Sequence, residues 1–448
     1  MMKNFVSWAL GAAVVAISAS LAQQAAADLY VTQVGDGSAA LSNASTAVFV
    51  QKFAVSGGSP LSTIALPTVG AGANLPLTNS GTATSEGFLA LSSNGQYLTL
   101  GGYGVAPGTA SIASTESGAV NRVVGRIELS SGAVDTTTAF ADGSFSQNNI
   151  RSVVSTDGQK FWVGGNGTPA ANGGVRYATL GSTTSAQITS SPTNIRVVKI
   201  FDGQLYASTM AGAFRGVSTV GVGVPEAADS ATLLPGFDPA TNSPQSVYDF
   251  WFKDDNTLYV ADDRSAASGG GIQKWLFDGA AWSLSYTLGV GTGARGLAGA
   301  VDGENVTLYA TTTQNAANNL VAIVDSGASS TFSVLASAPA NTAFRGVAYV
   351  PSGISPPGNN ADFNGDNIVD GADFLIWQRG FGLTGQPNKS TGDANGDGNV
   401  NGLDLDQWKS KFGGAPAVAA IGAVPDPASL GLASLAALAL LGLRSRAR

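Results

Sequence analysis

Two short segments near the C-terminal end concentrate carboxylate and carboxamide side chains at a regular spacing. They are ADFNGDNIVDGADF, from residue 361, and GDANGDGNVNGLDL, from residue 392. A twelve-residue calcium loop takes oxygen ligands from positions 1, 3, 5, 7, 9 and 12. Counted in this way, the ligand residues are Asp362, Asn364, Asp366, Ile368, Asp370 and Asp373 in the first loop, and Asp393, Asn395, Asp397, Asn399, Asn401 and Asp404 in the second.

The side-chain ligand positions of both loops hold only Asp or Asn. Position 7 uses its backbone carbonyl, so Ile368 is compatible with the pattern. Carboxylates crowded into an empty loop repel one another, and a bound cation reverses that effect. Oxygen ligands of this kind suit a hard cation. The sequence therefore predicts two Ca²⁺ ions, one in each loop, and the alternative is a solvated acidic linker.

A short amphipathic helix is expected after each loop, because apolar residues recur there at i, i+3 and i+7. These residues are Phe374, Trp377 and Phe381 after the first loop, and Leu405, Trp408 and Phe412 after the second. Gly382 and Gly413 follow as candidate helix C-caps. A segment of about 50 residues buries little core by itself, so bound metal should supply part of its folding free energy.

The repeated loop and helix resemble a type I dockerin between Ala361 and Gly413. Dockerins lack a helix before each loop, and the proline-containing run PSGISPPGNN before Asp362 cannot form one. The resemblance implies a small α-helical, EF-hand-like module that docks a cohesin-type partner. Dockerins often carry Ser-Thr at loop positions 10 and 11, where this chain has Gly371-Ala372 and Gly402-Leu403. This departure leaves open a self-associating module or a purely structural calcium clip.

Residues 1–27 are predicted to form a secretory signal peptide. Lys3 supplies a positive charge, the run from Trp8 to Leu21 is largely apolar, and Ala25-Ala26-Ala27 offers a cleavage site. The alternative is a buried helix or a membrane anchor.

Residues 425–448 combine a short motif, an apolar run and a basic end. Pro425, Asp426 and Pro427 precede an uncharged run from Ala428 to Leu443, which is short for a full crossing of roughly 20 residues. This plan resembles the PEP-CTERM sorting signal, in which Glu stands in place of Asp426. The resemblance implies processing by an exosortase-like enzyme and transient membrane association through the C-terminal helix, and the alternative is a plain tail anchor. We therefore expect a secreted protein that is extracellular, in the cell envelope or anchored at the surface.

The composition excludes several kinds of chemistry. The chain of 448 residues has no Cys and no His. Disulfides, thiolate sites, imidazole ligands and serine–histidine pairs are therefore impossible. The net charge of −8 provides no basic surface for nucleic acid, so no nucleic-acid partner is expected.

The long region from residue 28 to residue 350 repeats apolar runs joined by Asp-Gly or Asn-Gly turns. Examples are EGFLALSSNGQYLTLGG, from residue 86, and RSVVSTDGQKFWVGG, from residue 151. Such turns between apolar runs are hairpin signals. The units begin roughly 45–65 residues apart, which is enough for a four-stranded propeller blade. The run from Ala343 supplies one strand and the segment from Asp28 supplies others, so the two ends should complete one blade together.

These features predict a mainly β fold. The expected architecture is a six-bladed β-propeller, with a seven-bladed propeller and a pair of β-sandwiches as alternatives. The pattern is similar to the NHL/SMP-like and quinoprotein-like repeat propellers of exported proteins. The expected order is signal peptide 1–27, propeller 28–350, linker 351–360, dockerin-like module 361–414, linker 415–424 and sorting signal 425–448.

Arginines recur where the first strand of a propeller unit begins. They are Arg151, Arg196, Arg295 and Arg345. The first strand of each blade lines the central channel, so these residues are expected to form a ring that attracts an anionic ligand or a glycan. Glu86 and Asp249 lie near the equivalent point in the other two units. The alternative is that the arginines bridge neighbouring blades through carboxylates or carbonyls.

Two functions are compatible with the sequence. The first is a non-catalytic binding or scaffold protein of the cell envelope or extracellular matrix. The second is a carbohydrate-active hydrolase or lyase, acting in polysaccharide catabolism and recruited to an assembly through its dockerin. A glycosidase needs two carboxylates across one bond, and no motif of the propeller region pairs a Glu with an Asp. No catalytic residue is assigned.

Overall fold

The computed structural model describes residues 27–240, 246–351, 361–364, 368–384, 389–394 and 399–412. The chain divides into two compact units, Met1–Ile354 and Ser355–Arg448, which are described separately. The expected signal peptide up to residue 26, the linkers at 352–360 and 415–424, and the sorting signal with its apolar run lie outside the described residues. Within the described ranges, no helix has the length and hydrophobicity that a membrane crossing requires.

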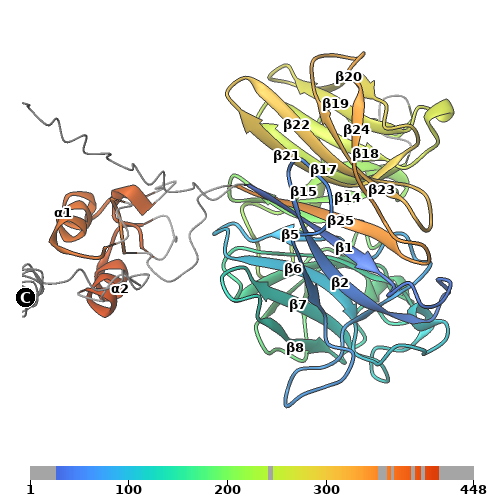
Figure 1. The fold of residues 1–448 in the computed structure, drawn as a ribbon, viewed down its shortest axis with the longest axis horizontal. Coiled ribbons are helices and arrows are strands. Elements are labelled where there is room, and N and C mark those ends of the chain that lie inside the picture. Colours follow the sequence, from blue (N-terminus) through green and yellow to red (C-terminus); the bar gives the residue numbers. More distant parts are fainter. Residues whose placement is uncertain are drawn as a thin grey trace, which may run out of the picture. The chain divides into compact units, whose positions relative to one another are not determined.

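The first unit consists of antiparallel β-sheets arranged as a propeller (Figure 1). Four of its sheets are four-stranded meanders in which neighbours along the chain are neighbours in the sheet. The first two are β9 (Ile150–Ser155), β10 (Lys160–Gly165), β11 (Gly174–Thr179), β12 (Ala186–Gln187) and β13 (Val198–Phe201), β14 (Gln204–Thr209), β15 (Gly216–Val220), β16 (Ala231–Leu233). The next two are β17 (Val247–Asp254), β18 (Thr257–Asp262), β19 (Gly271–Phe277), β20 (Trp282–Leu288) and β21 (Ala294–Asp302), β22 (Asn305–Thr312), β23 (Asn319–Val324), β24 (Phe332–Ser337).

The remaining nine strands form one continuous sheet. Its main order is β25 (Ala343–Val350), β1 (Asp28–Val34), β2 (Ser45–Ala54), β4 (Thr78–Ser80), β6 (Tyr97–Tyr103), β7 (Arg122–Glu128) and β8 (Val134–Phe140), with β3 (Ser62–Ala65) on β2 and β5 (Ala90–Leu91) on β6. The expectation of six or seven separate blades is therefore wrong as a count of separate sheets, because four separate blades are found. The physical reason is the short strand β4, which pairs with both β2 and β6 and joins their sheets. The β-sandwich alternative is wrong.

The first and last strands of the unit pair with each other. Strand β1 runs antiparallel to β25, from Asp28 opposite Val350 to Val34 opposite Ala343. Figure 1 shows the two strands side by side, one blue and one orange. This pairing of the two chain ends, expected from the sequence, is confirmed. It also places β1 between β25 and β2, so that both edges of β1 are hydrogen-bonded.

Tight turns and buried side chains explain why these segments form strands. Between β13 and β14, Asp202 and Gly203 both have positive φ angles, as a two-residue hairpin turn of the Asp-Gly type requires. Between the third and fourth separate sheets, Ile272, Leu297 and Leu308 are fully buried against one another. Each such side chain stabilises the fold by about 1.5–3 kcal/mol on burial. Short 3₁₀ helices lie in the connections, namely η1 (Ile112–Ser114), η2 (Ala170–Asn172), η3 (Gly212–Phe214) and η4 (Ala266–Ser268).

The second unit contains two short helices, α1 (Gly371–Gly380) and α2 (Gly402–Lys411), with the 3₁₀ helix η5 (Lys389–Thr391) between them. Both expected helices are present. Trp377, Val369 and Val400 are buried in its small core. Phe381 and Phe412, expected on the apolar faces, are instead 60% and 55% exposed, because each follows the last residue of its helix.

The innermost strands of the propeller approach one another so closely that one position requires glycine. Gly346 in β25 donates its N–H to the carbonyl of Gly87 at 3.0 Å. A Cβ at Gly346 would meet the backbone nitrogen of Leu89 and would lie 2.7 Å from the Gly87 oxygen. Since these atoms belong to backbone, they cannot move aside without opening the contact between the strands.

Gly346→Ala should therefore destabilise the propeller by about 1–3 kcal/mol, as overpacked cores do. Thermal unfolding followed by circular dichroism measures the effect. Gly289→Ala is the matched control, because a Cβ there would meet nothing within 4 Å. Equal melting temperatures for the two variants would contradict the close approach.

Candidate functional site

The first calcium-type loop is closed by its last ligand position. One oxygen of the buried Asp373 carboxylate, Oδ1, accepts hydrogen bonds from the backbone N–H of Phe363 at 2.7 Å and of Asn364 at 3.1 Å. The other oxygen, Oδ2, accepts from the N–H of Asp370 at 2.9 Å. The side chain of position 12 thus holds both ends of the loop together.

The second loop closes through the same contacts. Asp404 is buried, and its Oδ1 accepts from the N–H of Ala394 while its Oδ2 accepts from the N–H of Asn401, both at 2.8 Å. Ala394 and Asn401 stand at positions 2 and 9, as Phe363 and Asp370 do in the first loop. The sequence repeat is therefore a repeat of structure.

Helix α1 begins at a complete capping box. Asp370 is its N-cap, and the Asp370 side chain accepts from the N–H of Ala372 at 2.7 Å. Asp373 returns a hydrogen bond to the N–H of Asp370. Negative side chains at a helix N-terminus are favoured by the helix dipole. The same residues therefore shape the loop and start the helix.

Two tryptophans connect each helix to the other loop. The indole Nε1 of Trp377 donates to the carbonyl of Asn401 at 2.9 Å, and that of Trp408 donates to the carbonyl of Asp370 at 3.0 Å. Each tryptophan is residue 16 of its own repeat, and each acceptor is position 9 of the other. Phe374 packs on Trp408 with ring centroids 5.1 Å apart. From the sequence these tryptophans were expected only on apolar faces, although they stand at equal positions in the two repeats.

The donor chemistry of the loops fits a hard cation. The position-1 residues Asp362 and Asp393 are 3% exposed, and Asp373 and Asp404 are fully buried. Burial of carboxylates is costly unless a positive partner or several hydrogen bonds compensate it. Asp366, Asn395 and Asp397 lie outside the described residues. Among the residues that are described, no three acidic side chains form a group that could hold a metal ion.

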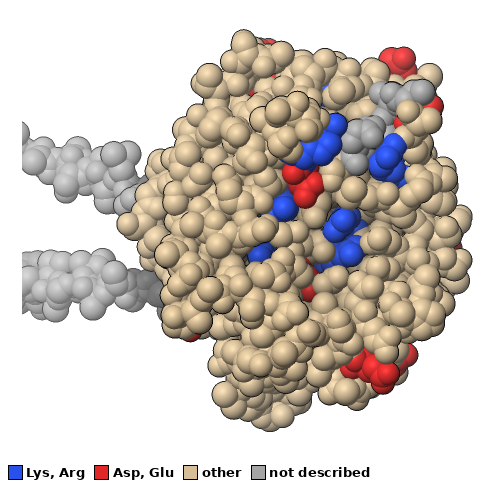
Figure 2. Space-filling view, turned by 90° about the vertical axis from the view of Figure 1, so that its right-hand side faces the viewer, with Lys and Arg blue, Asp and Glu red and all other residues tan. Residues whose placement is uncertain are grey.

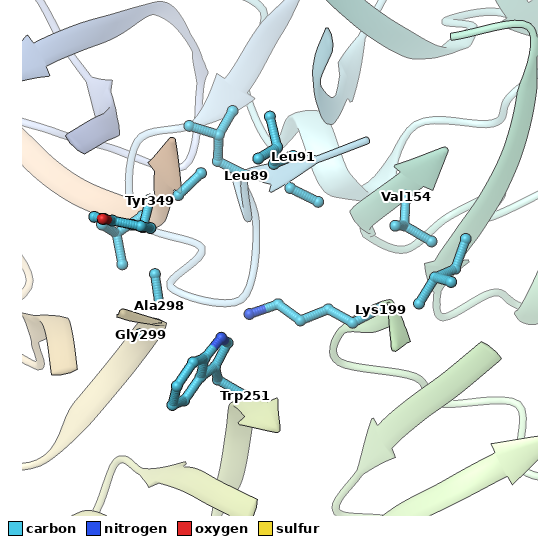
Figure 3. Close-up of a pocket in the computed structure, with 12 residues that line it drawn as sticks. Leu89, Leu91, Val154, Lys199, Trp251, Ala298, Gly299 and Tyr349 are labelled. Carbon is cyan, nitrogen blue, oxygen red and sulfur yellow. The ribbon is translucent and has the colours of Figure 1, made fainter. Parts of the chain in front are cut away.

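Residues of six innermost strands line a cavity of about 200 Å³ in the propeller (Figure 3). One lining residue from each strand is Ala90 in β5, Val154 in β9, Lys199 in β13, Trp251 in β17, Ala298 in β21 and Val347 in β25. Figure 3 shows the Lys199 side chain extending into the middle of these residues, close to Trp251. The strands of different sheets therefore meet around one central channel.

The ammonium group of Lys199 already forms an ion pair and hydrogen bonds within the propeller. Its Nζ lies 2.6 Å from Asp249 Oδ1 and donates to the carbonyls of Phe250 and Leu297 at 2.9 and 2.8 Å. Asp249 also accepts from the N–H groups of these two residues. Burial raises the pKa of Asp249, and the Lys199 charge opposes that rise. This pair joins neighbouring sheets and is not a free catalytic group.

The four arginines expected at the channel lie near one another. The Cζ atoms of Arg196 and Arg295 lie 4.6 and 5.7 Å from the ring centroid of Tyr248. The charge of Arg196 lowers the pKa of Arg151, after the larger effect of burial, and the charge of Arg295 acts in the same way on Arg345.

The sequence placed Asp249 near the equivalent point of the β17 unit, and in the structure it is the preceding residue, Tyr248, that lies beside these arginines. Asp249 is paired with Lys199, and the preceding residue, Tyr248, lies between Arg196 and Arg295. Successive side chains of a strand point to opposite sides. A shift of one residue therefore decides which side chain contacts the arginines and which one pairs with Lys199.

Some of the arginine N–H groups donate hydrogen bonds to neighbouring segments. This agrees with the alternative interpretation, in which the arginines bridge the blades. Arg151 Nη1 donates to Asn194 Oδ1 at 2.5 Å and to the carbonyl of Ile195 at 2.7 Å. Arg345 Nη2 donates to the carbonyl of Gly81 at 2.9 Å, and Arg295 Nη1 to that of Thr313 at 2.7 Å.

Comparison with family models finds a match within the second unit. Residues 358–412 match the model of the dockerin type I domain, so this part of the chain is a dockerin type I domain. Domains of this type bind calcium and imply a cohesin partner, and proteins that contain them are typically extracellular or associated with the cell surface. The search of curated proteins finds no match.

Solved structures resemble the chain only distantly. A chain of the nidogen/laminin complex has 12% identity and a TM-score of 0.42, with 72% of this chain and 98% of that chain covered. The PQQ-bound aldose sugar dehydrogenase from Streptomyces coelicolor has 12% identity and a TM-score of 0.36, with 70% and 98% covered. Neither similarity carries information about ligand or activity.

The tryptophan contacts lead to a prediction about the dockerin domain. Trp377→Phe and Trp408→Phe each remove one indole donor from a partly buried carbonyl, so each should destabilise the domain by about 0.5–1.5 kcal/mol. The readout is the calcium concentration at which the domain becomes folded, which should rise in both variants. Phe381→Leu, at an exposed position, is the control. An unchanged midpoint in the tryptophan variants would show that these hydrogen bonds do not stabilise the domain.

Proposed function

We propose that this protein is a secreted, non-catalytic binding component of a cell-envelope or extracellular assembly, attached through calcium-dependent docking of its dockerin domain. The observation that carries the proposal is the exact repeat of loop closure in the two halves of the domain. Both position-12 carboxylates bind the same two loop positions, and each tryptophan binds position 9 of the other loop.

In this proposal each loop holds one Ca²⁺ ion. The proposed side-chain ligands are Asp362, Asn364, Asp366, Asp370 and Asp373 in the first loop, and Asp393, Asn395, Asp397, Asn399, Asn401 and Asp404 in the second, with the Ile368 carbonyl at position 7. A bound cation offsets the repulsion among the buried carboxylates and stabilises the loop shape from which the helices begin. The folded pair of loops and helices is then the surface that a cohesin-type module recognises.

The propeller supplies the second half of the proposed function, a rigid body with a central channel. We propose six blades, with the nine-stranded sheet acting as two blades joined by β4. In support, β25 contacts β5 and β21, β9 contacts β5 and β13, and β17 contacts β21. Lys199 of β13 pairs with Asp249 of β17 and completes the circuit.

Secretion and sorting complete the proposal. The N-terminal segment would direct export, and Pro425, Asp426 and Pro427 with the following apolar run would direct processing by an exosortase-like enzyme. The support is the sequence pattern together with the dockerin domain, which is typical of extracellular proteins.

Calcium titration of the whole protein by isothermal calorimetry tests the proposal. We expect two binding events per chain, and their loss in the double variant Asp362→Ala, Asp393→Ala, which removes the first carboxylate of each loop. Asp406→Asn is the matched control, because its side chain is 71% exposed and lies outside the ligand positions. Retention of both events in the double variant would remove these loops as the calcium sites.

Binding to an immobilised type I cohesin measures the docking step. Binding should require calcium, be abolished by a chelator, and be lost in the same double variant while the Asp406→Asn variant still binds. Calcium binding without any cohesin binding would favour a structural clip, to which the residues at loop positions 10 and 11 already point.

A further inference from the structure

One side chain from each innermost segment of the propeller contributes to a ring of charged and aromatic groups. In order around the channel the ring residues are Arg151, Arg196, Tyr248, Arg295, Arg345 and Glu86. Neighbours in this order interact. Tyr248 is flanked by Arg196 and Arg295, and the Glu86 charge acts on both Arg151 and Arg345.

The deepest arginine of the ring retains unused hydrogen-bond donors. Arg345 is 2% exposed, and its Nε and Nη1 have no hydrogen-bond partner among the described residues. Arg151 is 5% exposed, and its Nε likewise has none within the described part of the chain. Buried donors without acceptors are costly, so residues placed only to bridge blades would be expected to use them.

The ring carries more positive than negative charge. Its four guanidinium groups face two carboxylates, Glu86 within the ring and Asp263, which lies 3.4 Å from Arg295. Glu86 accepts hydrogen bonds from Tyr103 and Asn149, and burial raises its pKa against the effect of these bonds. The pKa of Arg151 and of Arg345 is lowered to about 10. Burial is the larger cause, and the charge of a neighbouring arginine is the second. A bound anion would oppose this lowering, because a nearby negative charge favours the charged form of the guanidinium group.

Access to the ring is from one face of the propeller. Arg196 and Arg295 are partly exposed, whereas Arg151 and Arg345 are buried. Figure 2 shows Lys and Arg side chains gathered around a hollow near the middle of one face, with acidic side chains among them. The ring therefore has two donors near its opening and two at depth.

We propose that this ring binds a small oxyanion, with a carboxylate, phosphate or sulfate group held by Arg345 and Arg151 at depth and by Arg196 and Arg295 at the opening. Guanidinium groups suit this chemistry because their planar N–H donors match oxyanion geometry and remain charged. The site goes beyond the docking function, since it involves no residue of the dockerin domain.

Calorimetric titration of the full-length protein in Tris–chloride buffer tests the site. The probes are sodium sulfate, inorganic phosphate and glucuronate, with glucose as the neutral control. We expect binding heat from at least one oxyanion and none from glucose. The probe that binds most tightly shows whether the site prefers a carboxylate, a phosphate or a sulfate group. No heat from any of the three at millimolar concentration would overturn the proposal.

Variants separate a binding ring from a purely structural one. Arg345→Gln and Arg196→Gln should each weaken the best probe by about tenfold or more, as loss of a charge-assisted contact does. Arg196→Gln serves if Arg345→Gln does not fold, because Arg196 lies at the open side. Glu86→Gln should tighten binding, since it removes the ring's own carboxylate.

Arg176→Gln is the matched control. Arg176 is also a buried arginine with an unused nitrogen among the described residues, but its Nε binds Ser144 and Ser185, which lie outside the ring. Equal affinity in Arg176→Gln and Arg196→Gln, or weaker binding in Glu86→Gln, would contradict the proposal. Calcium titration of the same variants should be unchanged, so the failure of this site is distinguishable from the failure of calcium-dependent docking.

Discussion

The antiparallel pairing of β1 with β25 is the constraint on which the propeller depends. It joins residues more than 300 positions apart, and it closes the circuit of strands that surrounds the channel. The position of Arg345 and the contact of Gly346 with Gly87 depend on that closure, because Arg345 and Gly346 belong to β25 while Gly87 belongs to the segment before β5.

The two parts of the chain handle buried charge in opposite ways. In the dockerin domain, carboxylates are buried at Asp362, Asp373, Asp393 and Asp404, where backbone N–H groups already satisfy some of their oxygens. In the propeller, guanidinium groups are buried and only partly satisfied by carbonyls. Under the two proposals above, an ion of opposite sign would stabilise each arrangement, because a buried charge is costly unless a partner compensates it.

Several elements could be predicted from the sequence because they depend on local chemistry. The Asp and Asn spacing of the two loops, the helices that follow them and the Asp202-Gly203 hairpin require only neighbouring residues. The predicted number of blades differs from the four separate blades that are found. The reason is the strand β4, whose three residues carry no hydrophobic pattern that would reveal it in the sequence. Tyr248 was not singled out from the sequence, because the repeats align only to within about one residue and its neighbour Asp249 carries the charge.

By itself, the sequence determined the repeated spacing of Asp and Asn in the two loops, the β character of the long region and the meeting of its ends, because these follow from residue type and spacing. Only the tertiary structure decided which side chains contact one another. It placed the indoles of Trp377 and Trp408 on each other's loops, paired Lys199 with Asp249, and set Tyr248 between two arginines. Those contacts join residues far apart in the chain, so their partners are fixed by packing and backbone geometry, which no local pattern contains.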